Sequence, residues 1–99
     1  MSNVVEFVSF KLNEGVSEQQ FLAASDEFNA GFLSLQKGFI NRKLLKNEDT
    51  WADLVLWETM EDAMNAVKAI EQSLSAKPYC EYIDENSCNM RHLTIVKSY

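Results

Sequence analysis

Hydrophobic and polar positions follow two different periods along this chain, and they predict an alternation of strands and helices. Residues 4–12 (VVEFVSFKL) carry β-branched and aromatic residues on both faces of a strand. Ser17 with Gln20 three residues later forms a capping box, so a helix is expected to begin there and to close by residues 37–38. The apolar positions of this helix are Phe21, Ala24, Phe28, Phe32 and Leu35.

The middle of the chain returns to the strand period. Residues 39–46 and 51–58 read as two strands joined by the polar turn 47–50, which is the pattern of a hairpin. In the second of these strands Trp51 and Trp57 share one face, and that face and the opposite one both carry apolar residues. A strand of this kind must be covered on both sides.

A second helix and a final strand complete the pattern. Thr59 can cap the helix, whose apolar stripe extends to Leu74 and fades before Pro78, since the residue before proline disfavours the helical region. Residues 78–83 predict one extra helical turn, with proline tolerated at its start, and residues 90–97 predict the last strand.

The order β-α-β-β-α-β predicts an α+β fold of the ferredoxin-like kind, in one domain that spans residues 1–99. Such a fold has a four-stranded antiparallel sheet with two helices on one face. Because two of the strands are apolar on both faces, the bare face needs a cover. The simplest cover is a second copy of the chain, sheet against sheet, which predicts a homodimeric α+β barrel.

Composition narrows the classes of partner. The 99 residues are 46% hydrophobic and carry a formal net charge of −6, which repels phosphate backbones and anionic lipid and argues against nucleic-acid binding. No apolar run approaches the ~18 residues that a membrane span needs. The start of the chain lacks the pattern of a signal peptide, so we expect a cytoplasmic protein in which Cys80 and Cys88 are reduced, small, buried hydrophobes.

Three segments give the chain a family resemblance: residues 10–17 (FKLNEGVS) before the first helix, Gly38-Phe39 at the start of the second strand, and residues 56–63 (LWETMEDA) before the second helix. Over roughly residues 4–74 the chain resembles the dimeric α+β barrel superfamily. It is most similar to small proteins of the antibiotic biosynthesis monooxygenase type and to the related stress-responsive barrel proteins.

This resemblance implies a pocket between sheet and helices that binds a flat, electron-rich aromatic compound. The compound is oxidised by O₂ without metal or flavin, because a deprotonated phenol or hydroquinone can itself reduce oxygen. The protein would supply a dry cavity, a proton acceptor and donors for the developing oxyanion. Barrel members that degrade haem carry a histidine on the second helix with a tryptophan nearby. Residues 59–74 contain neither, so haem chemistry is not expected.

Two residues are candidates for catalysis. Glu6 is a carboxylate within an apolar strand; facing a cavity, it would be desolvated and could act as a general base. Histidine is the side chain that most readily changes charge near neutral pH, and His92 lies on the strand expected to run antiparallel to the first. A contact between Glu6 and His92 would form an acid–base couple. The alternatives are a solvated or ion-paired Glu6 and a His92 bonded to backbone or water.

Six further residues are candidates for contact with a ligand. The resemblance makes aromatic and apolar groups the walls of a pocket, and tyrosine or arginine its donors; for each residue the alternative is core packing, lid packing or a surface ion pair. These residues are Trp57, Phe28, Met64, Tyr79, Tyr82 and Arg91. The competing hypothesis for the whole protein is a non-catalytic ligand-binding or stress-responsive barrel, in which aromatic side chains fill the cavity.

Overall fold

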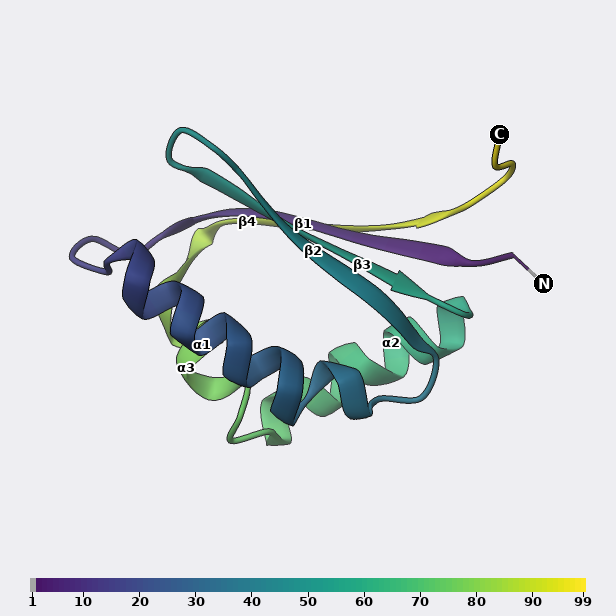
Figure 1. The fold of residues 1–99 in the computed structure, drawn as a ribbon, viewed down its shortest axis with the longest axis horizontal. Helices are drawn as coiled ribbons and strands as arrows, with labels where there is room; N and C mark the ends of the chain where they lie inside the picture. The colour runs from purple at the N-terminus through teal and green to yellow at the C-terminus, as the bar shows by residue number, and fades with distance from the viewer. Residues whose placement is uncertain (1) are drawn as a thin grey trace.

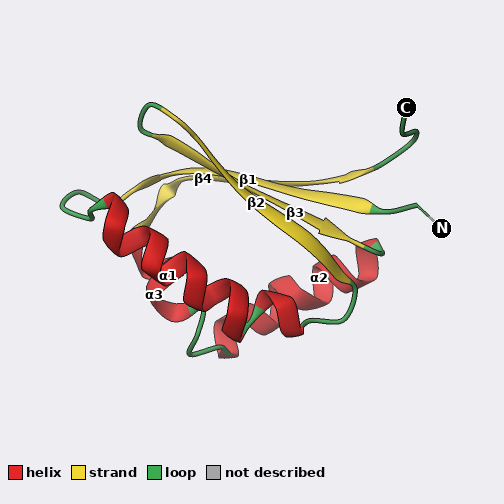
Figure 2. Ribbon diagram, viewed as in Figure 1, coloured by secondary structure: helices red, strands yellow, loops and turns green. Residues whose placement is uncertain are grey.

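A computed structural model describes residues 2–99, and its strands form one antiparallel sheet in the order β2-β3-β1-β4. Helices lie on one face of this sheet, as Figures 1 and 2 show, and leave the other face bare. The ferredoxin-like α+β fold expected from the sequence is confirmed. The strands are β1 (Val4–Leu12), β2 (Phe39–Asn47), β3 (Thr50–Trp57) and β4 (Ile83–Thr94).

The two main helices begin where their caps predict. Ser17 precedes α1 (Glu18–Gly31) with both reciprocal bonds of a capping box to Gln20. Thr59 precedes α2 (Met60–Ala69) and accepts a hydrogen bond from the backbone N–H of Asp62. Short turns follow each helix, and a third helix contains the predicted extra turn after proline. These segments are η1 (Leu33–Leu35), η2 (Ile70–Gln72) and α3 (Lys77–Tyr82).

Both main helices end earlier than the apolar spacing predicts. The first was expected to include Leu35, yet α1 ends at Gly31, a poor helix former, and Leu35 is 73% exposed. The second was expected to extend to Leu74, which is 84% exposed beyond the end of η2. In each case the chain tightens into a 3₁₀ turn whose first residue still contacts the core, and the last apolar residue of the predicted stripe lies outside it.

The last strand begins at Ile83, seven positions before the predicted start at 90, and ends at Thr94. Residues 84–89 are mostly polar and carry no strand signal, but β4 is the edge strand, so its side chains can stay in water. Pairing with β1 continues to Leu12↔Ile83 through an irregularity between Ser9 and Lys11. Tertiary pairing therefore determines the beginning of this strand.

The core lies between the sheet and the helices and is rich in aromatic rings. Tyr79 of α3 stacks on Phe28 of α1 at 4.5 Å between ring centroids, and on Phe21 at 4.9 Å. Phe21 in turn meets Trp51 edge-on at 5.0 Å. These rings occupy the space over the centre of the sheet, and they attach α1 and α3 to it.

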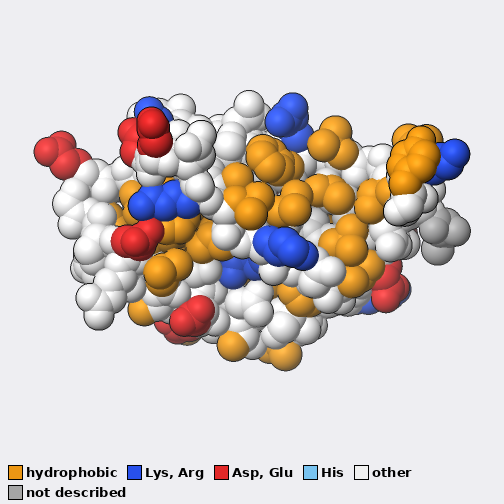
Figure 3. Space-filling view, turned by 45° about the horizontal axis from the view of Figure 1, so that its top comes forward, with side chains coloured by type: hydrophobic (Ala, Val, Ile, Leu, Met, Phe, Trp, Pro, Cys, Tyr) orange, Lys and Arg blue, Asp and Glu red, His pale blue; other side chains and the backbone are white. Residues whose placement is uncertain are grey.

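The other face of the sheet is apolar and open. Figure 3 shows hydrophobic side chains gathered along this side, with Lys and Arg among them. The residues of this outer face, as we call it, include the half-buried or exposed Val5, Phe7, Leu45, Leu54, Leu56 and Leu93. The prediction that β1 and β3 are apolar on both sides is thus confirmed. None of the described helices is long and apolar enough to cross a membrane.

Candidate functional site

Glu6 and His92 meet on the side of the sheet that faces the helices. They are paired across β1 and β4, and His92 Nε2 lies 3.0 Å from Glu6 Oε1. The side chains are only 11% and 13% exposed, respectively. The contact that the sequence predicted is therefore present, and Glu6 is largely buried.

Burial changes the proton affinity of this carboxyl. Removal from water raises the pKa of Glu6 above its ordinary value of 4.5, although the hydrogen bond and charge of His92 work in the opposite direction. The negative charge of Asp53 adds a smaller increase to the same pKa. A carboxylate with raised proton affinity, beside a histidine that can exchange protons with it, is suited to act as a general base.

Trp57 lies next to this pair. It is opposite Val4 on the neighbouring strand, two positions along β1 from Glu6, and its side chain is fully buried. The indole ring packs edge-on against Phe39 at 5.9 Å. Its Nε1–H is buried without a hydrogen-bond partner among residues 2–99. Trp57 thus lies beside Glu6, as a member of the core with a free donor.

A second buried cluster, unforeseen from the sequence, lies farther along the same face. Arg42 of β2 donates from Nε and Nη2 to the two carboxylate oxygens of Asp53, at 2.8 and 3.1 Å. Tyr79 donates its hydroxyl to Asp53 Oδ2 at 2.7 Å. Arg42 also donates to the backbone oxygen of Ser25 in α1, so this cluster links the sheet to two helices.

Charge in this second cluster is closely compensated. Burial alone would lower the pKa of Arg42, but its hydrogen bonds to Asp53 and the negative charge of Asp53 outweigh that effect and raise it. Burial, with the charge of Asp53, raises the pKa of Tyr79 far above its ordinary value, so the phenol remains a hydrogen-bond donor. The guanidinium also lies 5.2 Å from the ring centroids of Phe28 and Tyr79.

The sequence did contain a signal for this cluster. Asp53 stands between Trp51 and Val55 on a buried strand face, the same pattern of a carboxylate among apolar residues that singled out Glu6. Arg42 lies between Asn41 and Lys43, both exposed and polar, and nothing in this neighbourhood of the sequence marks it as buried. Only the pairing Arg42↔Val55, two positions from Asp53, brings the two together.

Two of the predicted ligand contacts cannot act as donors in a pocket beside Glu6. Tyr79 is buried in the core and bonded to Asp53, so it is not a donor at a pocket mouth. Arg91 is on the outer face with its guanidinium 5.5 Å from the ring of Phe7, because neighbouring residues of a strand point to opposite sides. It cannot reach the side that holds Glu6.

The remaining candidates lie on the helix side of the sheet, with different exposure. Phe28 is a core residue, stacked between Phe32 and Tyr79. Met64 is 40% exposed on α2, and Tyr82 is half-buried at the edge of the core. Phe28 therefore packs in the interior, and Met64 is partly exposed to solvent and lines neither of the two clefts described below.

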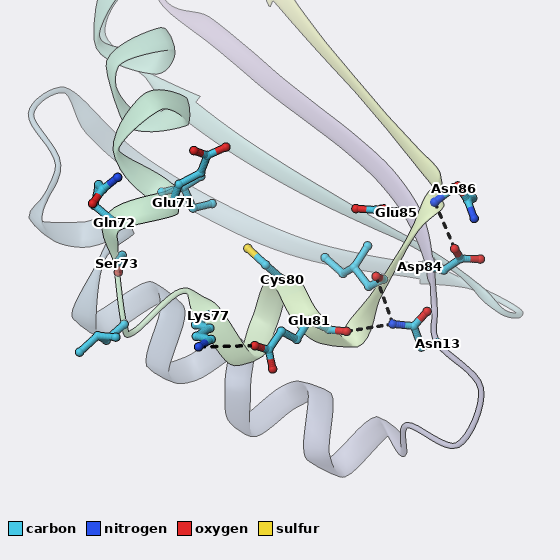
Figure 4. A pocket seen from close by; sticks show the side chains of 13 residues that line it. Asn13, Glu71, Gln72, Ser73, Lys77, Cys80, Glu81, Asp84, Glu85 and Asn86 are labelled. Carbon is cyan, nitrogen blue, oxygen red and sulfur yellow. Dashed lines mark hydrogen bonds and ion pairs between the residues drawn. The ribbon is translucent and has the colours of Figure 1, made fainter.

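A surface cleft of about 770 Å³ lies between η2, α3 and the start of β4 (Figure 4). Its lining is rich in acidic and polar groups and excludes Glu6 and His92. Residues that line it include Asn13, Glu71, Lys77, Cys80, Glu81 and Asp84. A smaller cleft of about 340 Å³ beside Trp51 also lies apart from the pair. Among residues 2–99 no cluster of histidine, cysteine and acidic side chains is suited to hold a metal ion.

The cysteines are placed differently from the prediction. Both are free thiols, and both are exposed instead of buried in the core. Cys80 lies on the side of α3 that lines the larger cleft, and Cys88 is on the edge strand β4. Partial burial raises the pKa of each thiol, which keeps both in their less reactive, protonated form.

Comparison with known proteins gives likeness in structure alone. No family model matches the chain, and no curated protein matches its sequence. The N63A mutant of SnoaB, a cofactor-independent oxygenase from Streptomyces nogalater, is similar with a TM-score of 0.79 and 14% identity, over 99% of this chain and 97% of that one. A candidate antibiotic biosynthesis monooxygenase from Bordetella bronchiseptica has a TM-score of 0.78 and 18% identity, over 98% and 100%.

A third similar structure is that of a dimeric protein. A dimeric ferredoxin-like protein from an uncultured marine organism has a TM-score of 0.66 and 10% identity, over 100% of this chain and 92% of that one. Since every identity quoted is below 25%, these likenesses show a shared fold. The chain has the ferredoxin-like fold found in structures of the antibiotic biosynthesis monooxygenase type, as the sequence resemblance implied.

Proposed function

We propose that the protein is a homodimeric barrel protein that binds a small apolar or aromatic compound beside Glu6 and His92 and oxygenates it without a cofactor. The observation that supports this most is the buried pair itself, with Nε2 and Oε1 at 3.0 Å. Burying a carboxyl group costs free energy, and a role in proton transfer with the neighbouring histidine would explain why this sheet contains one. The fold shared with a cofactor-independent oxygenase is consistent with this chemistry.

The reaction needs only substrate and O₂. Glu6 or His92 removes a proton from an activated CH₂ group or a phenol, and the resulting anion transfers an electron to O₂. Recombination forms a hydroperoxide on carbon; loss of water then leaves a carbonyl. For a CH₂ group the balance is CH₂ + O₂ → C=O + H₂O, with all electrons from the substrate. The protein contributes the base and a site of low dielectric.

The experiment is oxygen uptake with a panel of anthrones and quinols. The wild-type chain is compared with Glu6→Gln and His92→Ala, and with Glu14→Gln as a control at an exposed carboxylate. We expect turnover of at least one compound, and a loss of about 100-fold or more in the first two variants, as is usual for removal of a general base. Absence of turnover across the panel, or equal rates in all variants, would contradict the proposal.

A homodimer would cover the outer face. Burial of a contiguous apolar patch is what drives stable association of this kind, and the dimeric neighbour of the same fold is consistent with it. We expect Leu54→Asp, at the centre of the outer face, to give a monomer in native mass spectrometry. Leu35→Asp, an equal change at a position 73% exposed on the helix side, should leave the dimer intact. A monomeric wild-type chain would contradict this part of the proposal.

A non-catalytic barrel is the second candidate, and one observation favours it. Aromatic rings occupy much of the space between sheet and helices, including Phe28 and Tyr79 at 4.5 Å. A core filled in this way leaves less room for a flat ligand. Under this hypothesis the Glu6→Gln variant keeps every ligand-binding and folding property of the wild type.

A further inference from the structure

Residues 95–99 leave the sheet with their large apolar side chains uncovered. The backbone N–H of Ile95 still donates to the oxygen of Asn3, at 2.9 Å, and beyond this bond the segment runs free of the sheet. Val96 is 94% exposed, and Tyr99 is fully exposed. Figure 1 shows the segment rising on the bare side of the sheet, away from the helices. Burial of these two side chains against another surface would therefore be favourable.

The same segment also carries a positive charge. The ammonium group of Lys97 lies 4.8 Å from the centroid of the Tyr99 ring. Lys97 is exposed and belongs to none of the ion pairs found among residues 2–99. A surface that receives this segment should thus combine apolar groups with uncompensated carboxylates.

The larger cleft, between η2, α3 and the start of β4, offers apolar groups. Leu74 in its lining is 84% exposed, although leucine is among the side chains most often buried. Ile70 and Ile83 line the cleft as well, and both are half-buried. This part of the surface gains from a cover in the same way as Val96 and Tyr99 do.

The cleft also offers an excess of negative charge. Figure 4 shows carboxylates on several sides of the opening. Those in its lining belong to Glu71, Glu81, Asp84 and Glu85. Among the described residues that line it, Lys77 is the only cation, and it pairs with Glu81 at 4.0 Å. The other three carboxylates leave the cleft negative, which complements the charge of Lys97.

The segment cannot fill the cleft of its own chain. Thr94 pairs with Val4 and Ile83 with Leu12, so the two ends of β4 are separated by the length of β1, roughly 27 Å. Five extended residues reach only about 17 Å. A segment of this kind that occupies the cleft must therefore come from a second molecule.

A second copy of the chain brings the segment to the cleft. Two sheets that pack face to face lie ~10 Å apart, which is within the reach of five residues. A two-fold axis across the strands reverses the strand direction in the partner, so the end of β4 in one protomer lies over the start of β4 in the other. Because β4 is an edge strand, the segment can pass around the partner's sheet to the cleft on its helix side.

Building on the proposed homodimer, we infer that residues 95–99 of each protomer dock in the larger cleft of the partner. Val96 and Tyr99 cover the apolar lining at Leu74, and Lys97 lies among the carboxylates. The cleft is then an interface between two copies of the chain. Two-fold symmetry gives each dimer this contact twice.

Cys80 lines the cleft and provides a natural probe of the contact. In a Cys88→Ser background, Lys97→Cys places a second thiol on the segment, and diamide oxidises two neighbouring thiols to a disulfide. We expect Lys97→Cys to give a covalent dimer on a non-reducing gel. Lys37→Cys, a matched change at an exposed lysine of the loop before β2, should give none.

A charge exchange tests the contact without a cross-link. We expect Lys97→Glu and Glu85→Lys each to weaken the dimer about tenfold in sedimentation analysis, because each dimer contains the contact twice. The two changes together should restore the wild-type dissociation constant, since the charges are again opposite. Glu14→Lys, at an exposed carboxylate of the turn before α1, is the control and should leave the constant unchanged.

The possible failures are distinguishable. A wild-type chain that is dimeric, but in which Lys97→Cys forms no more covalent dimer than Lys37→Cys does, would overturn the inference and leave the proposed homodimer in place. Failure of the double charge exchange to restore the dimer would overturn it as well. A monomeric wild-type chain would overturn both the homodimer and the docking of its C-terminal segment.

Discussion

Glu6 and Asp53 are two buried carboxylates on the same face of one sheet, in neighbouring strands, and their surroundings differ. Asp53 receives three hydrogen bonds, from Arg42 and from Tyr79, and its charge is paired with a guanidinium. Glu6 has one partner, His92, whose own charge depends on protonation. The first group is saturated, and the second retains the capacity to bind another group.

This difference separates a structural carboxylate from a reactive one. A charge that is fully compensated holds elements together, and removal of either partner leaves the other buried and unpaired. Glu6 lies on the interior strand β1 beside an unpaired donor, and its titratable partner His92 lies on the edge strand β4, so this carboxylate can exchange a proton with an incoming molecule. Burial alone does not distinguish the two, since both residues are below a tenth exposed.

The largest effect is expected at Asp53. Asp53→Asn leaves the Arg42 guanidinium buried without a negative partner, so the free energy of unfolding should fall by about 3–5 kcal/mol in urea denaturation. Asp49→Asn is the matched control, because the side chain of Asp49 is 76% exposed and such a change costs about 0.5 kcal/mol or less. A small loss at Asp53 would mean that the cluster is not what anchors the helices.

A smaller loss is expected at Tyr79. Tyr79→Phe keeps the ring between Phe21 and Phe28 and removes one hydrogen bond to a carboxylate, which lowers the free energy of unfolding by about 1–3 kcal/mol. Tyr82→Phe, at a half-buried position of the same helix, provides the comparison. Equal losses in the two variants would show that the Asp53 bond contributes little.

The smallest effect concerns the pH dependence of stability. The folded chain raises the pKa of Glu6, so the folded state holds that proton more tightly than the unfolded state. The contribution is complete below the ordinary value of 4.5 and is lost as pH rises through the folded pKa. Compared with Glu6→Gln, the wild type should therefore lose stability over that interval in urea titrations at successive pH values. A gain of stability with rising pH would contradict the role of burial.

Much of this architecture could be predicted from local signals. Some signals depend only on residues that are close together in the sequence. These are the caps at Ser17 and Thr59, the hairpin turn and the strands that are apolar on both faces, and together they predict the order of the elements. The Glu6–His92 contact followed from the topology, because the first and last strands of this fold are adjacent. These predictions needed no information about side-chain packing.

The parts that could not be predicted depend on contacts between distant segments. The buried state of Arg42 and the bond from Tyr79 to Asp53 require the exact approach of β2, α1 and α3. The early start of β4 depends on pairing of polar residues with β1. Exposure of Cys80 and Cys88 likewise follows from a surface cleft and a sheet edge that no local pattern reveals.

The central claim is that Glu6 acts in proton transfer, whereas Asp53 stabilises the fold. The most direct test measures, on one preparation of Glu6→Gln, both the free energy of unfolding and the rate of oxygen uptake with the compound that the wild type turns over. We predict a free energy of unfolding within about 1 kcal/mol of that of the wild type, and a rate of oxygen uptake at least about 100-fold lower. An unchanged rate, or a loss of stability as large as that of Asp53→Asn, would contradict the account.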